Sequence, residues 1–163
     1  MPKYVTEALL TLVVLVLQTT LLRFMAIGGL TPDLLLLWIV AVAVRQGQVT
    51  ATVVGFCSGL ALDLLSGNDG MLGLAALSKT VAGFLAGYFY GENKILQTLS
   101  SYRFVLIALL IGIVHNLIYF IFFLQGSEVS WWGAVLFYGI PTALYTAAVG
   151  LIPMFIYARK ALS

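Results

Sequence analysis

The sequence predicts an all-α polytopic membrane protein, a bundle of six transmembrane helices in a single domain over residues 1–163, and two observations carry this prediction. Hydrophobic residues make up 62% of the chain and charged residues 9%, with a mean hydropathy of +1.09, whereas soluble domains are about 25% charged. A length of 163 residues accommodates about six spans of roughly 20 residues with short connections. The net charge of +2 comes from basic residues spread over the whole chain, so the sequence indicates no nucleic-acid-binding patch.

The first predicted span covers about residues 4–24 and carries Glu7, Thr11 and Gln18 close to one helical face. We expect this face to point into the bundle, with Glu7 and Gln18 as interior polar residues. The alternative for Glu7 is solvation near the membrane surface. Because the apolar run is long for a signal peptide and lacks a clear cleavage site, we expect the span to be retained.

The second predicted span covers about residues 32–45. Thr31-Pro32-Asp33 has the form of a helix start, with a hydroxyl N-cap, proline at the first helical position and a carboxylate in the first turn. The twelve residues from Asp33 to Val44 give roughly 18 Å of helix, against a hydrocarbon core of about 30 Å. We therefore expect that the helix starts within the membrane or that the preceding loop is partly buried.

The third and fourth predicted spans, about residues 49–66 and 71–91, form a hairpin with small residues on both arms. Turns are expected at residues 45–48 and 66–70, which are polar and rich in glycine. Small residues recur at four-residue spacing, a pattern that lets membrane helices approach each other closely. The candidate helix-packing residues are Ala51, Gly55 and Gly59 on one arm, and Gly83, Gly87 and Gly91 on the other.

The fifth predicted span, about residues 104–125, carries His115 and Asn116 near its middle. We expect these two side chains to form an interior hydrogen-bonded pair, because the same helix carries no second histidine or cysteine to complete a metal site. The single cysteine, Cys57, lies among apolar residues and is interpreted as a packing residue.

The sixth predicted span covers about residues 135–157. Pro141 and Pro153 are expected to bend or end it, because proline lacks a backbone N–H and crowds the preceding turn. Trp131 and Trp132 precede the span in the predicted connection, where tryptophan suits the level of the lipid headgroups.

Basic residues predict the orientation. With six spans, both termini lie on one side, together with the connections before the third and fifth spans. That side carries Lys3, Arg45, Lys94, Arg103, Arg159 and Lys160, whereas Arg23 is on the opposite side. The positive-inside rule then predicts a multi-pass inner-membrane protein with both termini in the cytoplasm.

Asp63 and Lys79 are the charged residues that need the most explanation, because each is expensive to place within a membrane span. They flank the turn between the third and fourth spans, at depths that differ by roughly 7 Å, which a snorkelling lysine can largely cover. We expect an intramembrane ion pair between them. The alternative is that each side chain reaches water separately.

The sequence indicates no catalytic site. It contains no facing carboxylates, no HExxH helix, no GxSxG elbow and no phosphate-binding glycine loop. We therefore expect a non-enzymatic protein with no cofactor and no metal site. A transporter subunit is the competing class, because the interior polar residues provide the lining of a small cavity, and lipid-headgroup binding is a third.

Five short segments carry a family resemblance: PDLLLL at 32–37, RQG at 45–47, GLALDLLSG at 59–67, GLAALS at 73–78 and GFLAGY at 83–88. In these segments, and in its length and six-span layout, the chain resembles the rod shape-determining protein MreD family. The resemblance implies an inner-membrane scaffold of the bacterial cell-elongation complex, which supports lateral peptidoglycan synthesis and cell shape.

The resemblance also implies partners and a fold. The partners are an MreC-like bitopic protein, the MreB filament, a RodA-type polymerase with its transpeptidase, and membrane lipids. The fold is similar to the substrate-binding subunits of energy-coupling vitamin transporters. That similarity keeps a small-molecule-binding transporter subunit open as an alternative function.

Overall fold

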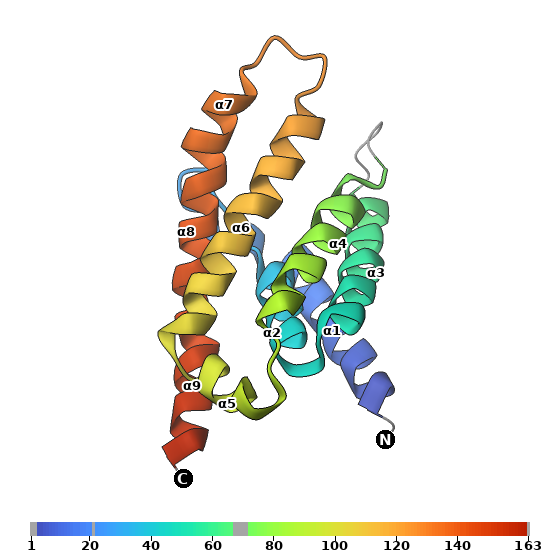
Figure 1. The fold of residues 1–163 in the computed structure, drawn as a ribbon. Coiled ribbons are helices and arrows are strands. Elements are labelled where there is room, and N and C mark those ends of the chain that lie inside the picture. Colours follow the sequence, from blue (N-terminus) through green and yellow to red (C-terminus); the bar gives the residue numbers. More distant parts are fainter. Residues whose placement is uncertain (1–2, 21, 67–71, 163) are drawn as a thin grey trace.

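Helices make up the regular structure of the computed structural model, which describes residues 3–20, 22–66 and 72–162. Both chain ends lie at the same end of the bundle, as does the short helix α5 (Figure 1). A turn closed by the bridge between Ile27 and Leu30 precedes the second long helix. The elements are α1 (Lys3–Thr20), η1 (Leu22–Met25), α2 (Leu34–Gln46), α3 (Gln48–Ser66), α4 (Leu74–Ala86), η2 (Gly87–Phe89), η3 (Glu92–Lys94), α5 (Ile95–Leu99), α6 (Tyr102–Phe123), α7 (Trp131–Ala134), the π-helical segment η4 (Val135–Gly139), α8 (Ile140–Val149) and α9 (Leu151–Leu162).

Within the described residues, three helical segments are long and apolar enough to cross a membrane: Gln48–Leu65, Tyr102–Phe123 and Trp131–Lys160. Three further apolar helices are shorter, Val5–Thr20, Leu34–Gln46 and Leu74–Phe89. The chain is therefore an all-helical membrane protein. In the predicted first span, residues 22–24 belong to η1 and residue 21 lies outside the described residues. In the predicted fourth span, residues 90–91 follow the end of η2.

The short helix α2 lies at the centre of the bundle, where it packs against α1, α3, α4 and α6. Its buried residues occur on all of its faces, from Leu35 to Val44. The predicted helix start is wrong by two positions, because Asp33, not Thr31, is the N-cap. Pro32, expected inside the helix, is fully buried just before it. The helix thus begins inside the bundle, because its preceding segment is partly buried.

Helices α3 and α4 form an antiparallel pair with more mutual contact than any other pair of elements (Figure 1). The tight turn from α2 into α3 uses Gly47 at φ 85°, where its N–H donates to Ala43 O at 2.9 Å. The predicted turn at 66–70 falls mostly on residues outside the described part of the chain. Helix α4 ends at Ala86 and continues as η2, so Gly91 lies in the connection to η3.

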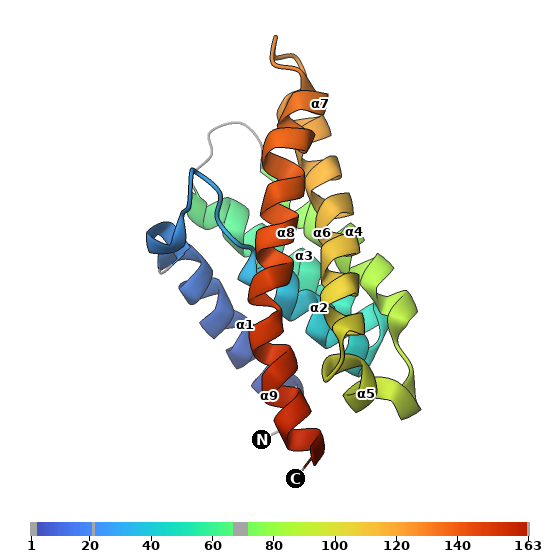
Figure 2. The ribbon, with the colours of Figure 1, turned by 90° about the vertical axis from the view of Figure 1, so that its left-hand side faces the viewer.

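The C-terminal segment from α7 to α9 runs as one nearly continuous rod beside α6 (Figure 2). Pro141 does not end it, because the π-helical segment η4 comes immediately before and relieves the crowding that proline causes in the preceding turn. Pro153 lies in the first turn of α9, where a missing N–H costs little. Trp131 and Trp132, expected in the connection, begin α7.

Candidate functional site

The buried start of α2 has its backbone donors satisfied by two side chains and one carbonyl. Asp33 Oδ1 accepts from Leu36 N–H at 2.9 Å, and Gln18 Oε1 on α1 accepts from Leu34 N–H at 2.8 Å. Leu37 N–H donates to Asp33 O at 3.2 Å. The first N–H groups of a helix have no partner within the helix and are costly to bury unpaired. Gln18 and Asp33 therefore allow this helix to begin inside an apolar bundle.

Lys79 on α4 forms an ion pair with Asp33 at the same place. The side chain of Lys79 is 1% exposed and that of Asp33 is 15% exposed. Thr146 on α8 accepts a hydrogen bond from Asp33 N–H at 2.9 Å. An unpaired buried charge is strongly unfavourable, so the loss of either residue would leave the other charge buried without a partner. The pair thus connects α4 to the start of α2.

The predicted ion pair between Asp63 and Lys79 is therefore wrong, because Lys79 pairs with Asp33. Asp63 near the end of α3 accepts three backbone hydrogen bonds, from Gly73 at 3.1 Å, Ala75 at 3.1 Å and Ala76 at 3.0 Å. It thus caps the N-terminus of α4, where a carboxylate is also favoured by the helix dipole. Gly73, the N-cap position itself, has no side chain to do this.

His115 and Asn116 on α6 link α4 to the C-terminal rod. His115 Nε2 lies 3.2 Å from Ser78 Oγ, and His115 Nδ1 lies 3.2 Å from Asn116 Oδ1. Asn116 Nδ2 donates to Gly139 O at 2.7 Å. That carbonyl belongs to the π-helical segment, so the network bridges three elements.

These groups surround a cavity of about 260 Å³ between α1, α3, α4, α6, α8 and the segment that precedes α2. Its polar lining includes Gln18, Asp33, Lys79, His115 and Asn116. The volume is below the range of about 300–1,000 Å³ that is typical of small-molecule sites. The cation Lys79 and the anion Asp33 are paired with each other. The pair therefore stabilises the bundle, and it leaves no unpaired charge for a ligand among the described residues of the cavity lining.

Four of the candidate packing glycines lie at close approaches between α3 and α4. A Cβ atom on Gly55 or Gly59 would collide with the backbone of Lys79 or Ala75, respectively. A Cβ on Gly83 would collide with the backbone of Ala51, and one on Gly87 with Gln48. Gly91 does not belong to this contact, since a Cβ there would meet only the Lys94 side chain, at 3.7 Å. The small residues thus serve packing within the chain.

Three polar residues of α1, Glu7, Thr11 and Gln18, face α2. Glu7 lies 3.5 Å from Arg45 at the end of α2, and Thr11 Oγ1 accepts from Trp38 Nε1 at 2.9 Å. The Arg45 guanidinium lies over the Trp38 ring, 4.9 Å from its centroid. Glu7 is thus in contact with a cation inside the bundle.

Two contacts of the site were not predicted from the sequence: that of Asp33 with Lys79 and that of Ser78 with His115. One signal for Asp33 was available: a helix too short for the membrane places its first residues at depth, where a carboxylate needs a cation. For Ser78, no local pattern in the sequence marks the contact, because the two residues lie on different helices.

A family model described as rod shape-determining protein MreD matches residues 3–161. No curated protein and no solved structure matches the chain.

Proposed function

The chain belongs to the rod shape-determining protein MreD family, and we propose that it is a non-enzymatic scaffold of the bacterial cell-elongation complex, holding the transmembrane helix of an MreC-like bitopic partner. Family membership supports a role in rod-shape determination. In this proposal the assembly also includes a RodA-type polymerase with its transpeptidase, and the MreB filament on the cytoplasmic side. The protein thereby supports lateral peptidoglycan synthesis.

The observation that carries the proposal is an apolar groove between α1 and α3, with a volume of about 370 Å³. Its lining from Glu7 to Leu15 and from Thr50 to Ala61 extends over roughly 12–17 Å of helix. Small residues line it, among them Ala8, Cys57 and Ala61. Helix association within a membrane depends on such close packing, since lipid tails are as apolar as the helices.

In the proposed orientation all six long helical segments cross the membrane, with both termini in the cytoplasm. Support comes from the basic residues, which gather at the end of the bundle where the chain begins and ends (Figure 1). The structure places there Arg45 in the last turn of α2, Lys94 in η3, and Arg159 and Lys160 in the last turn of α9. A cytoplasmic face enriched in lysine and arginine follows the positive-inside rule.

In-cell photocrosslinking tests the groove. A photoreactive amino acid replaces Leu12 or Val53, which are 59% and 56% exposed beside the groove, or Leu144 on α8, which is 53% exposed and serves as the control. We expect crosslinks to the MreC-like protein from Leu12 and Val53 and not from Leu144. Crosslinking from Leu144 alone would place the partner on the C-terminal rod and refute the groove.

Substitution provides a second test. Ala61→Trp fills the groove at its α3 side, and Leu144→Trp is the matched bulky change on the opposite rod. We expect the first variant to lose copurification with the MreC-like protein and the second to keep it. Equal copurification by both, at equal amounts of folded protein, would contradict the proposal.

A small-molecule-binding subunit of an energy-coupling-type transporter is the second candidate function. The cavity lined by Gln18, Asp33, Lys79, His115 and Asn116 favours it. Native mass spectrometry of the purified chain tests this candidate: a stoichiometric small molecule retained by the unmodified chain would support it, and an unliganded chain that still binds the MreC-like protein would favour the scaffold.

A further inference from the structure

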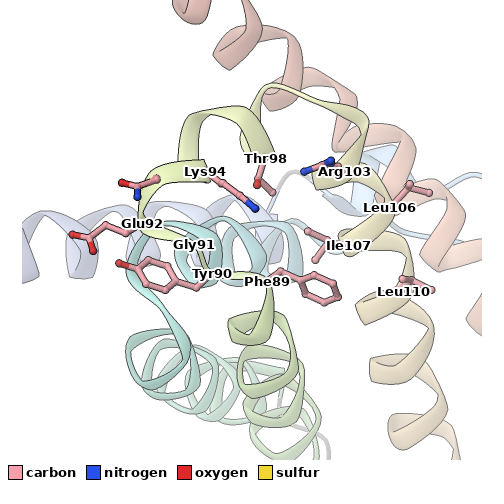
Figure 3. A pocket seen from close by; sticks show the side chains of 11 residues that line it. Phe89, Tyr90, Gly91, Glu92, Lys94, Thr98, Arg103, Leu106, Ile107 and Leu110 are labelled. Carbon is pink, nitrogen blue, oxygen red and sulfur yellow. The ribbon is translucent and has the colours of Figure 1, made fainter.

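A second cavity lies at the end of the bundle that holds the chain termini, and the scaffold proposal makes no use of it. It has a volume of about 600 Å³ and is lined by residues of η2, η3, α5 and the first half of α6. Figure 3 shows its lining side chains. Its chemistry divides into a cationic side and an apolar side.

The cationic side consists of Lys94 in η3 and Arg103 in the first turn of α6. Figure 3 shows Thr98 between these two side chains. Both cations are exposed, and within the described part of the chain neither makes an ion pair or a side-chain hydrogen bond. Glu92 also lines the cavity, but Figure 3 shows its carboxylate directed away from both cations. Two converging cations without a protein partner match an anion.

The apolar side consists of Phe89, Leu106, Ile107 and Leu110. Leu106 and Leu110 are one turn apart on α6 and are 57% and 55% exposed. They follow Arg103 on the same helical face, so the wall extends roughly 10 Å from the cation along a helix long and apolar enough to span the membrane. The cavity therefore presents positive charge at the end of a span and hydrocarbon along it.

We propose that this cavity binds an anionic phospholipid from the leaflet at the terminal side of the bundle. The lipid phosphate lies between Lys94 and Arg103, with the Thr98 hydroxyl as a further donor, and an acyl chain lies along Leu106 and Leu110. Basic pockets at the ends of membrane helices recognise anionic headgroups through this combination of charge and apolar surface. The site lies apart from the groove between α1 and α3, and lipid binding does not require the MreC-like partner.

Native mass spectrometry of the full chain in a mild detergent tests the proposal, with equimolar phosphatidylglycerol and phosphatidylcholine as probes. We expect preferential retention of phosphatidylglycerol. Lys94→Gln and Arg103→Gln each lower that retention about fivefold, the factor that corresponds to one basic residue near an anionic membrane surface. Each lowers the retention of phosphatidylcholine less, because the choline ammonium already offsets the charge of that phosphate. Arg159→Gln removes an exposed cation of α9 outside the cavity and is expected to change retention less than twofold.

A further variant separates the apolar wall from the charge. Leu110→Gln is expected to lower retention of both lipids, while unchanged helical circular dichroism shows that the chain remains folded. Equal retention of the two lipids by the unmodified chain, or an equal loss in Arg159→Gln and Arg103→Gln, would overturn the proposal. Displacement of the lipid by millimolar inorganic phosphate would also overturn it, because the site would then recognise the free anion.

Discussion

Removal of Lys79 is expected to be among the most destabilising single substitutions in this protein. Lys79→Met keeps much of the aliphatic stem but leaves Asp33, which is 15% exposed, without its cation. Removing one partner of a buried ion pair costs about 3–5 kcal/mol. Asp33 retains its hydrogen bond from Leu36 N–H, so we expect a loss near the lower end of that range.

A double-mutant cycle isolates the ion pair from the packing of the side chains. Asp33→Asn preserves an amide oxygen that can accept the N-cap hydrogen bond while it removes the charge. In the Asp33→Asn, Lys79→Met double variant no unpaired charge remains. We therefore expect it to be more stable than Lys79→Met alone, with a coupling free energy of about 2 kcal/mol or more.

The free energy of unfolding is measured by helical circular dichroism as the mole fraction of sodium dodecyl sulfate increases in mixed micelles. The matched control is a cycle between Asp63→Asn and Lys79→Met, for which we expect no coupling because Asp63 bonds to the start of α4. Coupling below about 0.5 kcal/mol, the level found for residues without contact, in the Asp33–Lys79 cycle would refute the reasoning. A coupling free energy that is larger in the Asp63–Lys79 cycle than in the Asp33–Lys79 cycle would also refute it.

The remaining predictions use the same unfolding assay, except where stated. Gly59→Ala is expected to lower the free energy of unfolding by about 1–3 kcal/mol through overpacking, because its Cβ would lie 2.6 Å from the Cα of Ala76 in α4. Gly91→Ala is the neutral control, since its Cβ would have its nearest contact at 3.7 Å. Equal effects of the two substitutions would contradict the close packing of α3 on α4. Asp63→Ala removes the acceptor for three backbone N–H groups, so we expect faster amide hydrogen exchange in the first turn of α4 and a loss of about 1–2 kcal/mol; unchanged exchange there would count against the cap. Asn116→Leu leaves the carbonyl of Gly139 without its donor, so we expect the free energy of unfolding to fall by about 1–3 kcal/mol. An unchanged free energy of unfolding would show that this hydrogen bond does not stabilise the bundle.

Local patterns in the sequence were sufficient for several features of the candidate site. The spacing of Glu7, Thr11 and Gln18 places them on one face of a helix whatever surrounds it, and in the structure that face contacts α2. Glycine at four-residue intervals similarly marks a helix surface without side chains. These inferences depend only on helix geometry, which a sequence of consecutive residues determines.

The partner predicted for Lys79 was wrong because depth along two adjacent helices, α3 and α4, does not include carboxylates on other elements. Asp33 is separated from Lys79 by 46 positions and lies at the start of a helix of 13 residues. Such a helix spans about 20 Å, less than the hydrocarbon core, so its N-cap can lie deep in the bundle. Its actual depth depends on how four other helices pack around it.

The sequence by itself determined the membrane class of this protein, the approximate positions of its six longer helical segments, and the small surfaces along α3 and α4. Hydropathy and helical periodicity suffice for these features because both act over short stretches of chain. Only the tertiary structure decided which carboxylate neutralises Lys79, that Asp63 caps α4, and that the cavities lie where they do. Those outcomes depend on side-chain distances between elements remote in sequence, and such distances are set by packing of the whole bundle.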